Sequence, residues 1–171
     1  MKQLKHIIQE KLKIGKTSFM LEKLKVSSKT KINTYRYHPK NLNELKNIIK
    51  DLVKERGWNA DLNDIDVSKI TSMFFLFTND LKTFNGNISE WNVSNVFTFE
   101  AMFYTSEFTG ENSDLSNWDV SGADCLACMF ERSKFNQREQ IEHWKVNSEA
   151  ELQGMFRNSP LEKNPPKWYH G

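Results

Sequence analysis

The residues of this chain best suited to chemistry are its two cysteines, Cys125 and Cys128, which form a C-x-x-C motif. Two thiols at this spacing can act as a redox pair or supply half of a zinc site. The sequence has no second C-x-x-C, and His143 is the only histidine nearby in sequence. The pair therefore has two interpretations: a metal or redox site, or ordinary positions of a repeated sequence. The repeat described below favours the second.

The histidines and the acidic residues do not form a recognised catalytic or metal-binding motif. The four histidines lack the H-E-x-x-H and H-x-x-E-H spacings of zinc hydrolases. The stretch DLNDID at 61–66 resembles the opening of a calcium-binding loop. Its fifth position is Ile65, however, and its sixth is Asp66, where the calcium loop requires glycine. We expect no enzymatic activity, no metal and no cofactor.

The composition is that of a water-soluble chain. Its 171 residues are 38% hydrophobic and 27% charged, with a mean hydropathy of -0.66. Apolar runs are only a few residues long, which predicts no transmembrane segment. Charges interrupt the apolar positions of the N-terminal stretch MKQLKHIIQEKLKIGK, so no secretion signal is predicted. Together with the low cysteine content, this leads us to expect a cytoplasmic protein.

Charge is distributed unevenly along the chain. Residues 1–57 contain 15 basic and 5 acidic side chains, whereas the remainder contains 9 basic and 17 acidic ones. Residues 1–57 are thus basic, and the rest of the chain is acidic. Such asymmetry suits either recognition of an anionic partner or contact between the two halves.

An internal repeat dominates the second part of the chain. Four valines stand 26, 27 and 26 residues apart, and a phenylalanine follows each of them ten residues later. The valines are Val67, Val93, Val120 and Val146; the phenylalanines are Phe77, Phe103, Phe130 and Phe156. A fixed period of this length is typical of stacked repeat architectures, in which neighbouring units bury a shared core.

Each unit is predicted to contain a strand followed by a short helix. The residues before each valine fit L-x-x-L-x-L, as in Ile88-x-x-Trp91-x-Val93, which predicts a strand with its tryptophan in the core. Val96, Phe99 and Met102 then recur every three residues, which favours one face of a helix. The residues expected to cap these helices are Ser68, Ser94, Ser121 and Asn147. A return loop follows, anchored by Phe84, Phe108, Phe135 or Leu161.

The pattern gives a three-part organisation. Residues 1–37 form a basic leader, expected to be a partly ordered helix and linker. Residues 38–60 hold a capping helix, with Asn41 and Glu44 as a capping box and Gly57 as its stop. Residues 61–171 hold the repeats and end in a degenerate edge, where Trp168 takes the place of a fifth repeat tryptophan.

The phrase FNGNISEWNVSNVFTFEAMF resembles the BspA-like leucine-rich repeat of bacterial surface proteins and mycoplasma lipoproteins. The match extends over about residues 61–168. The resemblance implies an α/β repeat fold, namely a short solenoid of about four strand-helix units, used for adhesion or protein-protein interaction and without catalytic machinery. A bacterial or phage origin fits this resemblance.

The predicted function is therefore a non-enzymatic interaction module that docks a protein on an acidic strand face. The residues expected on that face are Asp64, Asp66, Glu90, Asn92, Asn117, Asp119 and His143. The alternatives are binding of nucleic acid or an anionic surface through the basic leader, and a tethered protein carried by a phage or mobile element. The identity of the partner and the oligomeric state are left open.

Overall fold

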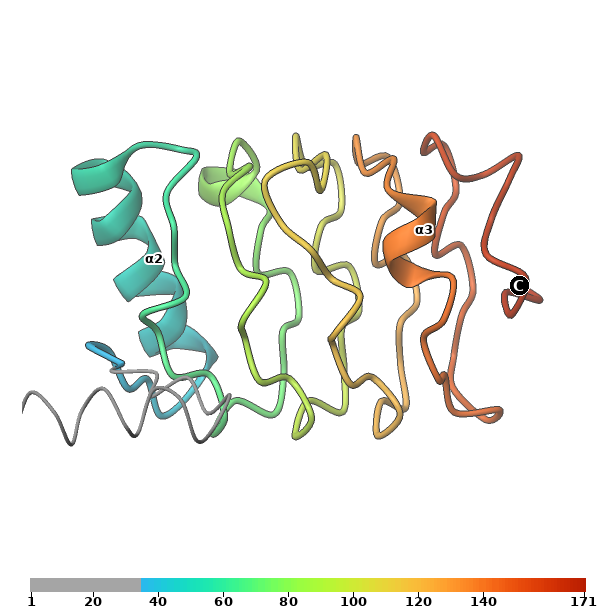
Figure 1. Cartoon of the computed structure of the whole chain (residues 1–171), viewed down its shortest axis with the longest axis horizontal. Coiled ribbons are helices and arrows are strands. Elements are labelled where there is room, and N and C mark those ends of the chain that lie inside the picture. The colour runs from blue at the N-terminus through green and yellow to red at the C-terminus, as the bar shows by residue number, and fades with distance from the viewer. Residues whose placement is uncertain (1–34) are drawn as a thin grey trace, which may run out of the picture. The chain divides into compact units, whose positions relative to one another are not determined.

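The computed structural model describes residues 35–171 and contains three short helical elements (Figure 1). These are α2 (Leu42–Arg56), the 3-10 helix η1 (Asn79–Leu81) and α3 (Arg138–Ile141). The predicted basic leader, residues 1–37, lies almost entirely outside the described residues, as do the alternatives that depend on it. The remaining described chain consists of turns and irregular backbone that pass side by side in successive copies of the repeat.

Helix α2 begins and ends where its sequence indicates. The Asn41 side chain accepts a hydrogen bond from the Glu44 N–H at 3.0 Å, and the Glu44 carboxylate accepts one from the Lys40 N–H at 2.9 Å. Together they satisfy N–H groups that the first turn leaves without a partner. Gly57 ends the helix with φ 86°, a conformation that glycine adopts at little cost. Leu45, Ile49, Leu52 and Val53 form the buried face of α2, which covers one end of the repeats.

The prediction of a strand-helix leucine-rich-repeat solenoid is wrong. Among residues 35–171 there is no extended strand and no sheet, only isolated parallel bridges between copies of the repeat, and no helix follows the predicted strands. The predicted strands are β-turns instead: the Trp91 N–H donates to the Ile88 carbonyl, and the Val96 N–H donates to the Val93 carbonyl. A turn closed by a hydrogen bond from residue i+3 to residue i brings its two end residues together. A spacing of three apolar residues therefore arises from consecutive turns as readily as from a helix.

Pairing between repeats occurs where the sequence predicted helices. We call residues 72–79, 98–105, 125–132 and 151–158 the ladder segments. Parallel bridges join Ser72 to Thr98, Thr98 to Cys125, and Cys125 to Glu151. Backbone N–H groups of alternate residues in one segment donate to carbonyls of the next; the Phe99 N–H, for example, lies 2.8 Å from the Cys125 carbonyl oxygen. Each segment thus supplies hydrogen-bond partners to the next one.

Two positions in every ladder segment adopt a left-handed backbone. The first series is Phe75, Ala101, Cys128 and Gly154; the second is Asn79, Thr105, Arg132 and Asn158. Their φ values run from 47° to 66°, although only one of the eight is glycine. Positive φ at the third residue of a turn is typical of a type II turn, so this conformation is a property of the repeat. It bends each ladder segment and keeps it from becoming a regular strand.

Most of the predicted core residues are buried although the predicted elements are wrong. Phe77, Phe103, Phe130 and Phe156 form a continuous stack, with centroid separations of 5.3, 5.4 and 5.9 Å. The return-loop phenylalanines form a second stack beside the first: Phe103 and Phe108 lie 4.3 Å apart. Stacked rings in a fully buried site add packing energy beyond the area that they remove from water.

The tryptophans connect neighbouring units by hydrogen bonds. The Trp91 indole N–H donates to the Leu62 carbonyl at 2.9 Å, and the same bond recurs one unit later in Trp118 and Trp144. Trp168 continues the series: its indole donates to the Ile141 carbonyl at 2.7 Å, and its ring stacks on Trp144 at 6.4 Å. A fifth unit is thus present up to its tryptophan.

Candidate interaction surfaces

Three of the predicted binding residues stabilise turns. Asp66, Asn92 and Asp119 each accept hydrogen bonds through Oδ1 from the N–H and the hydroxyl of the serine two residues later. The Ser121 hydroxyl lies 2.6 Å from Asp119 and holds the pKa of that carboxyl below its usual range. These contacts are Asx-turns, in which a side chain replaces a backbone partner. They also show that Ser68, Ser94 and Ser121 cap no helix.

Asp64 joins the first repeat to helix α2. Its two carboxylate oxygens accept hydrogen bonds from the two terminal nitrogens of Arg56, both at 2.9 Å. The Arg56 guanidinium lowers the pKa of Asp64, chiefly through these hydrogen bonds. A paired, half-buried carboxylate of this kind orients the helix on the repeats.

The remaining predicted residues do not complete a strand face. Glu90 is half-buried, and its N–H donates to the Asn63 side chain at 2.8 Å. Asn117 and His143 are exposed and lie in the β-turns of the third and fourth units. All seven residues thus lie in or beside turns, and their role in binding stays a prediction.

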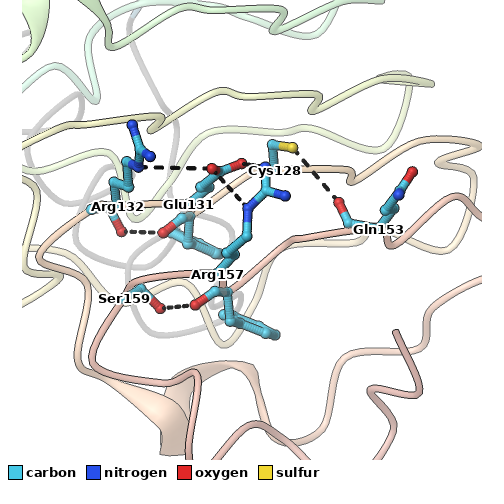
Figure 2. A network of polar contacts seen from close by, with 9 residues as sticks. Cys128, Glu131, Arg132, Gln153, Arg157 and Ser159 are labelled. Carbon is cyan, nitrogen blue, oxygen red and sulfur yellow. Dashed lines mark hydrogen bonds and ion pairs between the residues drawn. The ribbon is translucent and has the colours of Figure 1, made fainter.

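Cys128 lies in a network of polar contacts that favours a protonated thiol (Figure 2). Burial and the neighbouring Glu131 carboxylate raise the pKa of Cys128 to about 11. Burial likewise raises the pKa of Cys125. Since the thiolate is the reactive form of cysteine, these surroundings suppress nucleophilic chemistry near neutral pH. Both cysteines are free thiols.

Glu131 carries the only carboxylate of this network, and its side chain is 3% exposed. Arg157, one repeat later, donates to it from Nε at 2.9 Å and from Nη2 at 2.8 Å. These hydrogen bonds lower the pKa of Glu131, so the carboxyl stays ionised. A two-pronged bond between arginine and carboxylate is among the stronger polar contacts in proteins, and here it joins the third ladder segment to the fourth.

Sequence reasoning missed a group of partly exposed aromatic side chains on and beside the first two ladder segments. We define the aromatic patch as Phe74, Phe75, Phe97 and Tyr104. Phe74 and Phe97 are 42% and 49% exposed, whereas the core phenylalanines are almost completely buried. Phe75 contacts Phe74 with ring centroids 4.5 Å apart and Tyr104 at 6.0 Å.

Alignment of the four repeats would have indicated this patch. Phe74 occupies the position filled by Glu100, Ala127 and Gln153 in the other units. Phe97 likewise stands among Thr71, Asp124 and Ala150. An aromatic residue at a position that the other copies leave polar or small is not required by the shared core. Such a departure indicates a local role.

An apolar recess lies beside helix α2. Its volume is about 610 Å³, and Val53, Trp58 and Leu81 provide its apolar lining, with lysines and Asp80 at its edge. Trp58 is 42% exposed. The Lys50 ammonium donates to Asp80 at 2.9 Å, so part of the positive charge is already paired.

The part of the chain that the structure describes has neither a metal-binding cluster nor a membrane-spanning helix. Nowhere within residues 35–171 do three or more histidine, cysteine or acidic side chains gather in an arrangement that could hold a metal ion. No helix in this part of the chain is long and apolar enough to cross a membrane.

Comparison with known proteins identifies a family through the repeat region. Neither the curated proteins nor the solved structures contain a match to the chain. A family model described as "Mycoplasma protein of unknown function, DUF285" matches residues 43–168, which include most of helix α2 and all four ladder segments. The chain therefore belongs to the DUF285 family of mycoplasma proteins.

Proposed function

We propose that this chain is a non-enzymatic protein-interaction module that binds its partner through the aromatic patch. The observation that carries the proposal is the exposure of Phe74 and Phe97, since every other phenylalanine ring within residues 35–171 is more deeply buried. Exposing two large apolar side chains costs solvation energy and adds nothing to the shared core. Phe74 contacts Phe75, which in turn contacts Tyr104, and partly exposed aromatic residues are typical centres of protein interfaces.

The surroundings of the patch support binding more than catalysis. Tyr104 provides a hydroxyl next to the apolar rings, so the patch combines apolar area with a polar group, as binding surfaces commonly do. The raised pKa values of Cys125 and Cys128 make both thiols poor nucleophiles near neutral pH. The likeness of the repeat phrase to BspA-like repeats also supports an interaction role. A cytoplasmic location stays a prediction.

Site-specific photo-crosslinking in host lysate tests the proposal. A photoreactive phenylalanine analogue is placed at Phe74 in one variant, at Phe97 in a second, and at Asn117 in a third as an exposed site outside the patch. We expect the first two variants to crosslink to the same protein, identified by mass spectrometry, and the third to give no such product. Crosslinking to that protein only from Asn117 would favour the predicted acidic residues and would refute a role for the patch.

A titration with the purified partner then measures the contribution of the patch. Phe74→Ser combined with Phe97→Ser should weaken binding at least tenfold, because a central aromatic contact contributes about 2 kcal/mol or more. The matched control is Trp58→Ser, which removes an aromatic ring of similar exposure from the recess beside α2. Equal effects of the two changes on affinity would contradict the assignment.

A further inference from the structure

Most hydrogen bonds between a ladder segment and the following unit run in one direction, except that the N–H groups of Cys125 and Glu151, the first residues of the third and fourth segments, donate back to the Phe97 and Asp124 carbonyls. In each of the first three segments, alternate N–H groups donate to carbonyls of the following segment. The third segment shows the pattern: the N–H groups of Leu126 and Cys128 donate to the carbonyls of Glu151 and Gln153 at 2.8 and 3.1 Å. After its first residue, each of these segments therefore directs alternate N–H donors toward the following unit.

The last ladder segment has no successor among the described residues. The corresponding N–H groups belong to Leu152, Gly154, Phe156 and Asn158, and none of them donates to a backbone or side-chain acceptor in residues 35–171. Phe156 is buried and contacts the Tyr169 ring at 5.0 Å, whereas Leu152 and Gly154 are half-buried and Asn158 is exposed. Unpaired backbone donors of this kind are a ready template for an added chain.

A cavity lies beside the first part of this edge. Its volume is about 630 Å³, and its apolar lining comes from Val146, Ala150, Leu152 and Trp168. The cavity borders Leu152 and Gln153 of the last ladder segment. The edge thus offers both backbone donors and an apolar pocket.

We propose that this C-terminal edge binds an extended peptide of another protein, which runs parallel to residues 151–154 and accepts hydrogen bonds from Leu152 and Gly154. The peptide would place two carbonyls, two residues apart, against these N–H groups. The residue between them would point a large apolar side chain toward Leu152, as Leu126 and Phe99 do in the preceding segments. This mode of recognition is β-augmentation, in which main-chain bonds give affinity and the pocket selects the side chain.

A second copy of this chain fits the edge poorly. Two copies placed edge to edge would face donors with donors. The acceptor edge of a second copy is covered by helix α2, whose Lys46 ammonium donates to the Phe74 carbonyl at 3.3 Å. Neither end of a second copy is therefore complementary to the open edge. A peptide with free carbonyl groups fits this edge better. This site is separate from the aromatic patch, so either proposal can fail without the other.

Amide hydrogen exchange of the full chain provides the first test. Leu126 and Cys128 should be well protected, because their N–H groups are bonded to the next segment. Leu152 and Gly154 occupy the same positions one unit later and should exchange at least about tenfold faster, because one missing hydrogen bond contributes about 1 kcal/mol or more to protection. Equal protection in the dilute monomer would overturn the proposal. Protection that rises with protein concentration would instead show self-association and would also overturn it.

The second test adds a peptide copying residues 98–105 of the chain, acetylated and amidated at its ends. It should slow exchange at Leu152 and Gly154 by about tenfold at saturation and leave Leu126 and Cys128 unchanged. The matched control peptide carries aspartate in place of Phe99 and should give no protection at any concentration up to about 1 mM.

A protein variant separates the pocket from the backbone edge. Ala150→Phe fills the cavity from within and should abolish peptide protection, whereas Asn117→Phe, on an exposed turn, should leave it intact. If the copied peptide protected neither amide, or protected them equally in the Ala150→Phe variant, the assignment of this edge would be wrong.

Discussion

Replacing Arg157 with methionine should destabilise the chain strongly although Arg157 lies at the surface. The Glu131 side chain is 3% exposed, and Arg157 donates to both of its oxygens, at 2.9 and 2.8 Å. The substitution keeps most of the aliphatic contact of the arginine and removes the partner of a buried charge (Figure 2). The change therefore tests the ion pair and not the packing.

The expected loss in free energy of unfolding is about 2–3 kcal/mol at pH 7. A hydrogen bond to a charged group contributes about 1.5–3 kcal/mol, and a buried carboxylate left without its partner costs up to about 5 kcal/mol. The lower part of this range applies because Arg157 is 55% exposed and because Arg132 lies 3.9 Å from the same carboxylate. Arg132→Met is the matched control, and its cost should stay below about 1 kcal/mol because that contact is long and exposed.

Urea unfolding followed by circular dichroism between pH 7 and pH 3 measures the effect. The pKa of Glu131 in the folded protein lies below its ordinary value of 4.5, so its contribution to stability is present above that value and is lost as pH falls through the lowered folded pKa. The difference between the original chain and Arg157→Met should therefore be largest near pH 7 and shrink below pH 4.5. If Arg157→Met costs no more than Arg132→Met at pH 7, or if the difference is the same at pH 3, the argument from the buried carboxylate is refuted.

Three further outcomes follow from backbone geometry and thiol chemistry. Thr105→Asn should raise the free energy of unfolding by about 0.5–1 kcal/mol in thermal or urea melts, because a β-branched side chain is unfavourable at the Thr105 φ of 56°. Asn158 already occupies the same position of the last unit. A lower free energy of unfolding for Thr105→Asn would contradict this prediction. Gly86→Ala should lower the free energy of unfolding by about 2 kcal/mol or more, since a Cβ there would overlap the Ala60 carbonyl oxygen. Gly122→Ala is the control, because there is room for a Cβ at that position and stability should change little. Similar melting curves for the two variants would contradict the close packing around Gly86. Alkylation of Cys128 by iodoacetamide should be slow at pH 7 and should rise with pH toward the pKa of about 11, and a rate plateau below pH 9 would contradict it.

The core could be predicted from sequence because the repeat aligns equivalent positions four times. Trp91, Val93, Phe99 and Phe103 are all buried, as their columns indicated. Helix α2 could also be located, because its capping residues and its apolar stripe agree. Val146 and Leu152 are exceptions: both are only half-buried, and the turn of the fourth unit closes from Asn147 to Ala150, one residue later than in the other units.

The local backbone could not be predicted because its apolar spacing is ambiguous. Val96, Phe99 and Met102 recur every three residues, and both a helix and a series of β-turns satisfy that spacing. The residues with positive φ form turns and not a helix. Most of them, such as Phe75, Ala101 and Cys128, are residue types that rarely adopt a left-handed conformation, so the sequence did not indicate it. The strand face expected for the polar candidates is absent for the same reason, since Asx-turns exist there, and the role of these residues in binding stays a prediction.

The aromatic patch needed the structure for a different reason. A phenylalanine at position 74 or 97 is read most simply as core in a repeat that contains so many buried rings. Only its exposure distinguishes it from them. The Glu131 to Arg157 pair likewise joins residues 26 positions apart, a contact that becomes visible once the repeats are stacked.

The continuous phenylalanine stack also bears on how the chain unfolds. Each inner ring, such as Phe103, has a repeat phenylalanine on both sides, whereas Phe156 has Phe130 on one side and, within residues 35–171, only the rings of Trp168 and Tyr169 beyond it. In an array stabilised by nearest-neighbour contacts, a unit with one neighbour opens before a unit with two. The opposite end is protected by helix α2. Fraying should thus start at the C-terminal unit and proceed toward the helix, which gives the loss of structure a defined direction.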